Sequence, residues 1–111
     1  MAEKRDLKRK KKRLKLRFGV DCPKRIAFTE DLSDCGVFVI TGQPERPGTK
    51  LLMQITLPDE GEVIAHGRVQ WAKKVPPNMI RVAQKCGMGV RFLSFESGEE
   101  SYRKLIDELR H

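Results

Sequence analysis

Two polar residues stand two positions apart, Asp31 and Ser33, in a short segment that ends at Gly36. In extended backbone, residues two apart point to the same face, so a carboxylate and a hydroxyl would lie side by side. A carboxylate suits the two adjacent hydrogen-bond donors on the Watson–Crick edge of a guanine. Gly36 would permit a backbone turn that a Cβ would hinder. A local alternative stays open, in which Asp31 or Ser33 caps the backbone N–H groups of an ordinary turn.

Arginines recur every four residues in the basic N-terminal segment, at Arg5, Arg9, Arg13 and Arg17. The guanidinium fork donates two parallel hydrogen bonds, either to the O6 and N7 edge of guanine or to two phosphate oxygens. Lysine lacks this planar fork. Two such arginines on a mobile arm could clamp a nucleotide between its base edge and its phosphate. The alternative is a solvated run of charge that aids solubility or binds RNA weakly, and the spacing does not choose among the four arginines.

The net charge of +8 is concentrated at the N-terminus. Residues 1–17 contain ten of the 23 Lys and Arg residues and two of the 15 acids, so residues 18–111 contain thirteen of each. A nearly neutral body is not the basic face that follows a nucleic-acid duplex. No apolar stretch approaches transmembrane length, and no apolar block of a signal peptide follows the basic start. We therefore expect no membrane insertion and a cytoplasmic location.

Hydrophobic residues alternate along most of the chain, which is the period of half-buried strands. The clearest runs are Leu14, Leu16 and Phe18; Leu51, Met53, Ile55 and Leu57; Val63, Ala65, Gly67, Val69 and Trp71; and Met88, Val90 and Phe92. By this alternation Trp71 faces inward and packs in the core. About six strands joined by short turns, without helices between them, predict an antiparallel barrel or a strongly bent sheet.

The C-terminal segment changes to a helical period. Tyr102, Leu105, Ile106 and Leu109 form one apolar stripe, and Ser97 with Glu100 is a capping-box pattern. We expect an amphipathic helix at about residues 97–110 that packs on the barrel. Residues 1–12 have almost nothing to bury and are expected to form a flexible basic arm, which leaves residues 13–111 for the single folded domain.

The sequence offers little for catalysis or metal binding. Its three cysteines, Cys22, Cys35 and Cys86, are an odd number without Cys-x-x-Cys spacing, so we expect reduced, buried thiols rather than disulfides or a zinc site. No paired acids, Cys–His arrangement or Gly-rich phosphate loop occurs at useful spacing. We therefore expect no enzyme activity, no metal and no cofactor.

Taken together, these segments resemble the PilZ domain, a bacterial receptor module for cyclic di-GMP. Its marks are an Arg-x-x-x-Arg stretch before the first strand and an Asp/Asn-x-Ser-x-x-Gly motif shortly after, which residues 9–13 and 31–36 match. The alternating run after Arg13 resembles the family's first strand, which places Arg17 inside it and favours the pair Arg9 and Arg13. The resemblance continues through three further segments, residues 36–39, 67–71 and 87–92.

The resemblance implies a six-stranded antiparallel barrel with a C-terminal helix, acting in second-messenger signalling without catalysis. It also implies five residues that bind cyclic di-GMP: Arg9, Arg13, Asp31, Ser33 and Gly36. The arginines would hold guanine and phosphate groups, Asp31 and Ser33 would bond a guanine edge, and Gly36 would permit the turn. The resemblance implies that Lys8, just before the arginine motif, influences whether one or two ligand molecules bind, and that number stays open; Lys12 is a further accessory candidate. The signal would pass to a downstream protein that the sequence does not identify.

Two alternatives remain. One is a small basic β-barrel that binds single-stranded nucleic acid, which needs aromatic residues on exposed strands. The chain has five Phe, one Tyr and one Trp, most of them in core phase, so nucleic acid is the weaker prediction. The other is a PilZ-like protein adaptor that binds no nucleotide.

Overall fold

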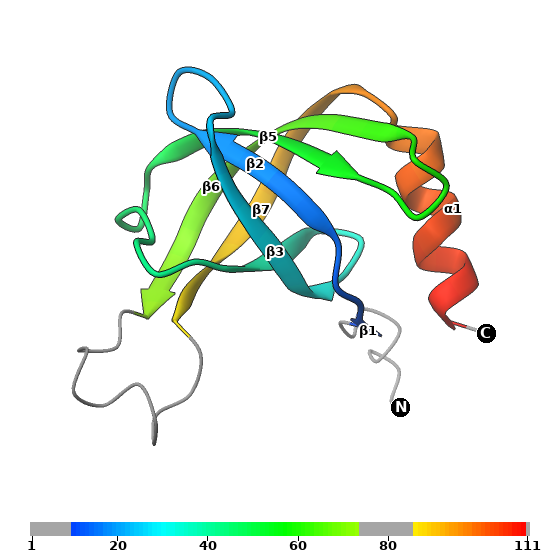
Figure 1. The fold of residues 1–111 in the computed structure, drawn as a ribbon, viewed down its shortest axis with the longest axis horizontal. Helices are drawn as coiled ribbons and strands as arrows, with labels where there is room; N and C mark the ends of the chain where they lie inside the picture. Colours follow the sequence, from blue (N-terminus) through cyan, green and yellow to red (C-terminus); the bar gives the residue numbers. More distant parts are fainter. Residues whose placement is uncertain (1–9, 74–85, 111) are drawn as a thin grey trace.

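The computed structural model describes residues 10–73 and 86–110. Over these residues the chain forms a series of β-strands followed by one α-helix (Figure 1). The elements are β1 Lys10–Lys11, β2 Lys15–Gly19, β3 Arg25–Leu32, β4 Gly36–Ile40, β5 Lys50–Thr56, β6 Glu62–Lys73, β7 Gly87–Ser97 and α1 Glu99–Arg110. Residues 1–9, which include Lys8 and Arg9, lie outside the described part.

Six of these strands form a closed antiparallel barrel. They follow one another in the order β3-β2-β5-β6-β7-β4, and pairing between β3 and β4 closes the ring. Phe28 of β3 lies at this closure, because it pairs with Lys15 of β2 on one side and with Ile40 of β4 on the other. The short strand β1 pairs with the last residues of β3, beyond the first residue of β2. The six-stranded antiparallel barrel with one C-terminal helix is therefore confirmed.

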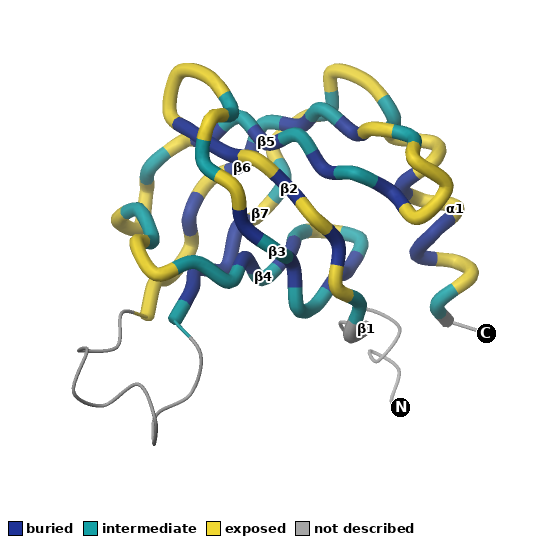
Figure 2. Tube along the Cα trace, viewed as in Figure 1, coloured by how far each residue is buried: buried dark blue, intermediate teal, exposed yellow. Residues whose placement is uncertain are grey.

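The core fills the inside of the barrel. Inward residues alternate with outward ones along most strands, and Figure 2 shows buried segments alternating with partly buried and exposed ones. The fully buried side chains include Leu16, Phe18, Val39, Met53, Ile55, Val63, Ala65 and Met88. Because each barrel strand has one buried face, the period of two seen in the sequence follows directly from the closure of the sheet.

Helix α1 covers one side of the barrel, next to the turn that joins β5 to β6 (Figure 1). Tyr102, Leu105 and Ile106 are buried and Leu109 packs against the core, so the apolar stripe faces the barrel as predicted. None of the described helical structure is long and apolar enough to cross a membrane.

The start of α1 differs from the predicted capping box. Ser97 is the last residue of β7, and the helix begins at Glu99. Gly98 stands between them with a φ of 83°, which glycine adopts readily. Its carbonyl accepts the Tyr102 N–H at 2.9 Å. The sharp reversal from strand to helix thus requires a left-handed residue, and the cap lies one position later than predicted.

The placement of Trp71 in the core was wrong, because β6 contains a bulge. Val69 pairs with Val90 and Trp71 pairs with Gly89, so Gln70 is an additional residue on β6. A bulge of this kind interrupts the alternation of faces. The Trp71 side chain is consequently 42% exposed and lies on the outer surface.

The prediction of buried thiols was also wrong for two of the three cysteines. Cys22 and Cys35 are exposed, Cys86 is partly buried, and none of the three forms a disulfide among the described residues. Cys22 and Cys35 both lie in bends between strands, where the inward and outward alternation of a strand does not apply.

Candidate ligand-binding site

The two sequence motifs meet on β3. Antiparallel pairing sets Lys11 opposite Asp31 and Lys10 opposite Leu32. Residues 10–11 therefore lie alongside the strand that begins the Asp-x-Ser-x-x-Gly motif, although the two segments are about 20 residues apart in the sequence. This pairing involves the end of the segment that we expected to be a flexible arm.

Arg13 lies in a bulge between β1 and β2. The pairs Lys11–Asp31 and Lys15–Phe28 leave three residues on the arm side opposite two on β3. The Arg13 side chain is exposed, and its guanidinium carbon lies 4.4 Å from the centre of the Phe28 ring. This cation–π contact holds the guanidinium on the outer surface of the barrel. Lys12 is partly buried, and its backbone N–H donates to the Glu30 carbonyl at 2.8 Å.

Asp31 lies on β3 between two neighbouring strands. Its backbone pairs with Lys11 of β1 and with Phe38 of β4. A shift in register between Thr29 and Asp31 makes Glu30 an additional residue relative to β4. Asp31 is partly buried while the next residue, Leu32, is fully buried in the core. Asp31 therefore lies beside the arm at the rim of the barrel.

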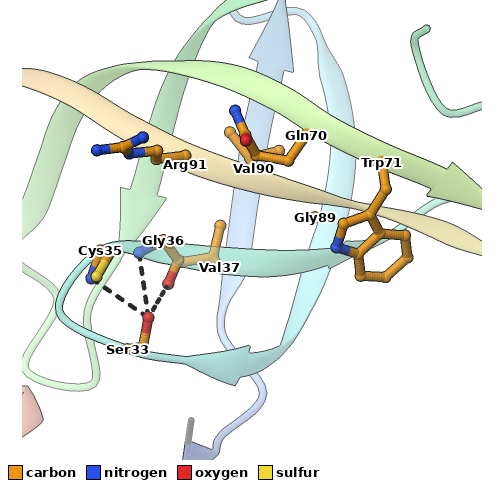
Figure 3. Close-up of a pocket in the computed structure, with 9 residues that line it drawn as sticks. All are labelled: Ser33, Cys35, Gly36, Val37, Gln70, Trp71, Gly89, Val90 and Arg91. Carbon is orange, nitrogen blue, oxygen red and sulfur yellow. Dashed lines mark hydrogen bonds between the residues drawn. The ribbon is translucent and has the colours of Figure 1, made fainter. Parts of the chain in front are cut away.

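Ser33 closes the turn between β3 and β4. Its Oγ accepts the N–H groups of Cys35 at 3.3 Å and Gly36 at 3.2 Å, and it donates to the Gly36 carbonyl at 3.2 Å (Figure 3). The Ser33 N–H also donates to the Gly36 carbonyl at 3.0 Å. These are the contacts of the local alternative, in which the hydroxyl organises its own turn. A direct bond from Ser33 to a ligand stays a prediction.

Gly36 is required by a close approach of two strands. A Cβ at this position would lie 2.2 Å from the Val90 carbonyl oxygen of β7. Its φ is not in the left-handed region, so the turn itself does not demand glycine. The hindrance that we predicted for a side chain here comes from the neighbouring strand β7.

A pocket of about 160 Å³ opens beside this turn. Its lining consists of Ser33, Cys35, Gly36, Val37, Gln70, Trp71, Gly89, Val90 and Arg91. Figure 3 shows the Ser33–Gly36 turn at one end and Trp71 at the other. The Trp71 ring lies directly over Gly89, where a Cβ would be 2.3 Å from the indole nitrogen. It also contacts Phe38, with ring centres 5.2 Å apart and planes tilted by 30°.

Trp71 and Arg91 were not among the predicted site residues. Arg91 follows the inward residue Val90 and is exposed on the outer face of β7, directly opposite Gly36. A signal for Trp71 was present in the sequence, because Gly89 leaves room on the paired strand for a large ring. This signal could be interpreted only with knowledge of the bulge at Gln70, which the β6–β7 pairing reveals.

Positive charge extends from the pocket across the outer face of the barrel. Arg91 is opposite Arg68 on β6, and Arg68 is opposite Lys50 on β5; all three side chains are exposed. Among residues 10–73 and 86–110, no carboxylate forms an ion pair with any of the three. Like charges directly opposite one another repel, so this row favours a negatively charged ligand nearby.

Helix α1 is tied to the motif by two hydrogen bonds. The buried Tyr102 hydroxyl donates to the Ser33 carbonyl at 2.6 Å, and the Arg103 guanidinium donates to the Asp34 carbonyl at 2.8 Å. Burial raises the pKa of Tyr102 well above its usual value, so the hydroxyl remains a donor throughout the physiological pH range. The turn that lines the pocket thus has a fixed connection to the C-terminal helix.

The site is made of side chains that can bind a ligand through charge, hydrogen bonds and stacking. In the described part of the chain, no cluster of His, Cys, Asp or Glu could hold a metal ion. The site combines guanidinium groups, a carboxylate and an exposed indole ring. That set suits a ligand with negative charge, hydrogen-bond donors and a flat aromatic face.

Comparison with known proteins agrees with this fold. The sequence matches the PilZ domain family over residues 3–109. The fold is similar to a solved structure titled "Structure of Bacillus subtilis Inhibitor of motility (MotI/DgrA)", with a TM-score of 0.70 and 17% sequence identity. The match covers 92% of this chain and 47% of that one, so the chain spans about half the length of the solved protein. No curated protein matches the sequence. The family match extends over nearly the whole chain, which therefore belongs to the PilZ domain family.

Proposed function

We propose that this protein is a receptor for cyclic di-GMP, the ligand typical of PilZ domains, and that it acts in the cytoplasm without catalysis. The observation that carries the proposal is the pairing of β1 with β3, which sets Lys11 opposite Asp31. Family membership supplies the class of ligand. The pairing supplies a reason why two motifs that are distant in sequence would act on one molecule.

Each proposed contact follows from the chemistry of the side chain. Arg13 offers a guanidinium fork for a phosphate or for the O6 and N7 edge of a guanine, and Arg9 has the same role by the family motif. Asp31 offers a carboxylate for the donors on a guanine edge. Ser33 and Gly36 hold the turn in the shape that lines the pocket. Lys8 and Lys12 remain accessory candidates.

The pocket residues add to this assignment. The exposed Trp71 offers an aromatic face on which a guanine could stack, and such stacking contributes about 1–3 kcal/mol per base. Arg91 lies at the same pocket and adds positive charge for a phosphate. Both side chains are on the outer surface, where they can reach a ligand without rearrangement of the core.

The affinity follows from two opposing terms. Ordering the backbone of an arm costs about 1–2 kcal/mol per residue, so five or six residues would cost on the order of 5–12 kcal/mol. Charge-assisted hydrogen bonds return about 1.5–3 kcal/mol each. Lys10 and Lys11 are already paired with β3, which lowers the entropy cost of ordering the arm. We expect micromolar to sub-micromolar binding that weakens with salt.

The output is a change of surface rather than a reaction. A ligand bound between the arm and the turn would bias both, and α1 is bonded to the turn through Tyr102 and Arg103. Helix α1 also lies close to β1. A downstream protein that contacts α1 or the arm would therefore distinguish the free receptor from the bound one.

Calorimetric titration of the full chain with cyclic di-GMP tests the proposal, with GTP as the competing guanine nucleotide. We expect saturable binding of cyclic di-GMP, weaker binding of GTP, and a loss of about tenfold or more in affinity for Asp31→Ala. The absence of binding by the folded wild-type chain would reject the receptor and favour the adaptor that binds no nucleotide.

One observation favours a second candidate function. Trp71 is exposed and provides an aromatic platform. The exposed cations Arg91, Arg68 and Lys50 on the outer face provide a positive track beside it, and such a combination binds single strands. Nucleic acid was the weaker prediction because Trp71 was expected in the core. A gel shift with single-stranded RNA, beside the calorimetric titration with cyclic di-GMP, separates the two functions, because a dinucleotide receptor binds only the cyclic dinucleotide whereas a nucleic-acid-binding barrel retards the RNA.

A further inference from the structure

Thr29 is a buried polar residue at the base of the arm. Its exposed fraction is 0%, and it lies on the inner face of β3, two residues from the core residue Ala27. In the described part of the chain, Ser33 is the other polar residue that is buried. A hydroxyl in such a place requires hydrogen-bond partners, because leaving it unpaired destabilises the fold.

The partners of Thr29 are both in the bulge that carries Arg13. The Thr29 Oγ1 donates to the Lys12 carbonyl at 2.6 Å and accepts the Leu14 N–H at 2.9 Å. The Thr29 N–H donates to the Leu14 carbonyl at 2.9 Å. The hydroxyl thus replaces the ladder bonds that the extra residue interrupts, on both sides of Arg13.

We propose that Thr29 is a positioning residue for ligand binding: its hydroxyl fixes the bulge that holds Arg13 over Phe28, ready to bind. This inference rests on the proposed function, in which Arg13 contacts cyclic di-GMP. The bonds restrain the backbone immediately before and after Arg13. The guanidinium is then limited to the surface near the Phe28 ring, 4.4 Å away.

The chemistry of the site distinguishes Thr29 from a residue that only fills the core. Valine has nearly the shape of threonine but has no hydroxyl, so Thr29→Val would keep the packing and leave the Lys12 carbonyl and the Leu14 N–H unpaired. Serine keeps the hydroxyl and removes only a methyl group. A packing role predicts that Thr29→Ser is the more harmful change, and a positioning role predicts that Thr29→Val is.

The test is a double-mutant cycle measured by calorimetric titration with cyclic di-GMP. We expect Thr29→Val to weaken binding roughly tenfold and Thr29→Ser to bind within about threefold of wild type. In a chain that already carries Arg13→Ala, adding Thr29→Val should cause no further loss, because the residue acts through Arg13. Additive losses in the cycle would overturn the proposal, as would a Thr29→Ser variant that binds as poorly as Thr29→Val.

A second readout tests the same bonds without ligand. Amide hydrogen exchange of Leu14, followed by NMR, should be at least about tenfold faster in Thr29→Val than in wild type or Thr29→Ser, because the N–H loses its acceptor. Exchange at Val63, on the far strand β6, should stay unchanged. Equal acceleration at both positions would indicate general destabilisation and refute the positioning role. If the wild-type chain binds no cyclic di-GMP, the proposed function fails, while the exchange measurement still decides whether Thr29 holds the bulge.

Discussion

Replacing Gly36 with alanine should destabilise the barrel, because the new methyl group would meet the backbone of β7. The Cβ would lie 2.2 Å from the Val90 carbonyl oxygen and 3.2 Å from the Arg91 Cα. An ordinary contact to oxygen needs about 1 Å more, and both obstacles are backbone atoms of a paired strand that cannot rotate away. The paired strands β4 and β7 would have to separate where Gly36 faces Arg91.

The size of the effect follows from three contributions. Overpacking of this kind costs about 1–3 kcal/mol, and a weakened ladder bond costs about 1 kcal/mol more. Replacing glycine restricts the unfolded chain, which stabilises the folded state by about 0.4–1 kcal/mol. We expect a net loss of about 2 kcal/mol in the free energy of unfolding, which lowers the Tm by roughly 10 °C for a domain of this size.

Gly42 provides a matched control for this change. A Cβ built there has no atom within 4 Å, and its φ is not in the left-handed region. Gly42→Ala should therefore leave stability unchanged or raise it by up to about 1 kcal/mol. Urea unfolding followed by circular dichroism measures both variants. Equal stability of Gly36→Ala and Gly42→Ala would refute the argument that β7 excludes a side chain at Gly36.

Three further predictions concern the helix connection, the indole ring and the charges. Tyr102→Phe removes the 2.6 Å bond to the Ser33 carbonyl and should lower the free energy of unfolding by about 1–2 kcal/mol; unchanged urea unfolding would contradict this. Burial raises the pKa of Tyr102, so the wild type keeps its full stability below the unfolded tyrosine pKa of about 10 and loses stability as the pH rises further. Tyr102→Phe has no hydroxyl to ionise and should lose less stability over the same rise in pH. Trp71 is the sole tryptophan, so its fluorescence should change and saturate as cyclic di-GMP is added, and Trp71→Ala should weaken binding roughly tenfold with little change in Tm; a constant emission during calorimetrically observed binding would place the ligand elsewhere. The dissociation constant should rise several-fold as salt increases, and a Kd that is independent of salt would contradict phosphate recognition by the arginines.

The barrel could be predicted from the sequence because closure imposes a period of two on most of its strands. Leu16, Phe18, Met53 and Ile55 are all buried, as their alternation indicated. The apolar stripe of α1 was predictable for the same reason, since a helix with one buried face repeats with the helical period. In both cases the burial of one face determines which residues the sequence places there.

The two sides of the pocket could not be predicted in the same way. The outward position of Trp71 depends on the additional residue Gln70, which is defined by the pairing of β6 with β7 rather than by β6 alone. Arg91 becomes a site residue because it is opposite Gly36, and cross-strand register is not encoded in local alternation. The exposed Cys35 lies in a bend, where the period of a strand ends.

The pairing of residues 10–11 with β3 could not be predicted from the sequence for a different reason. Residues 10–11 appear in the sequence as part of a solvated basic run, because a strand that pairs only through its backbone needs no apolar pattern. The structure shows why such a strand forms. β3 extends past Lys15, the first residue of β2, and the last residues of β3, Asp31 and Leu32, pair with Lys11 and Lys10. A free strand edge was thereby covered.

Comparison of Arg13→Ala with Arg17→Ala tests most directly whether the arm and the motif bind one ligand. Both arginines are exposed and four residues apart, but Arg13 lies in the bulge over Phe28, whereas Arg17 lies inside β2, opposite Ile26 and Gln54. In calorimetric titrations with cyclic di-GMP, we predict that Arg13→Ala weakens binding by about 10- to 100-fold and that Arg17→Ala stays within about threefold of wild type. Equal affinities of the two variants, or a greater loss with Arg17→Ala, would contradict the assigned site.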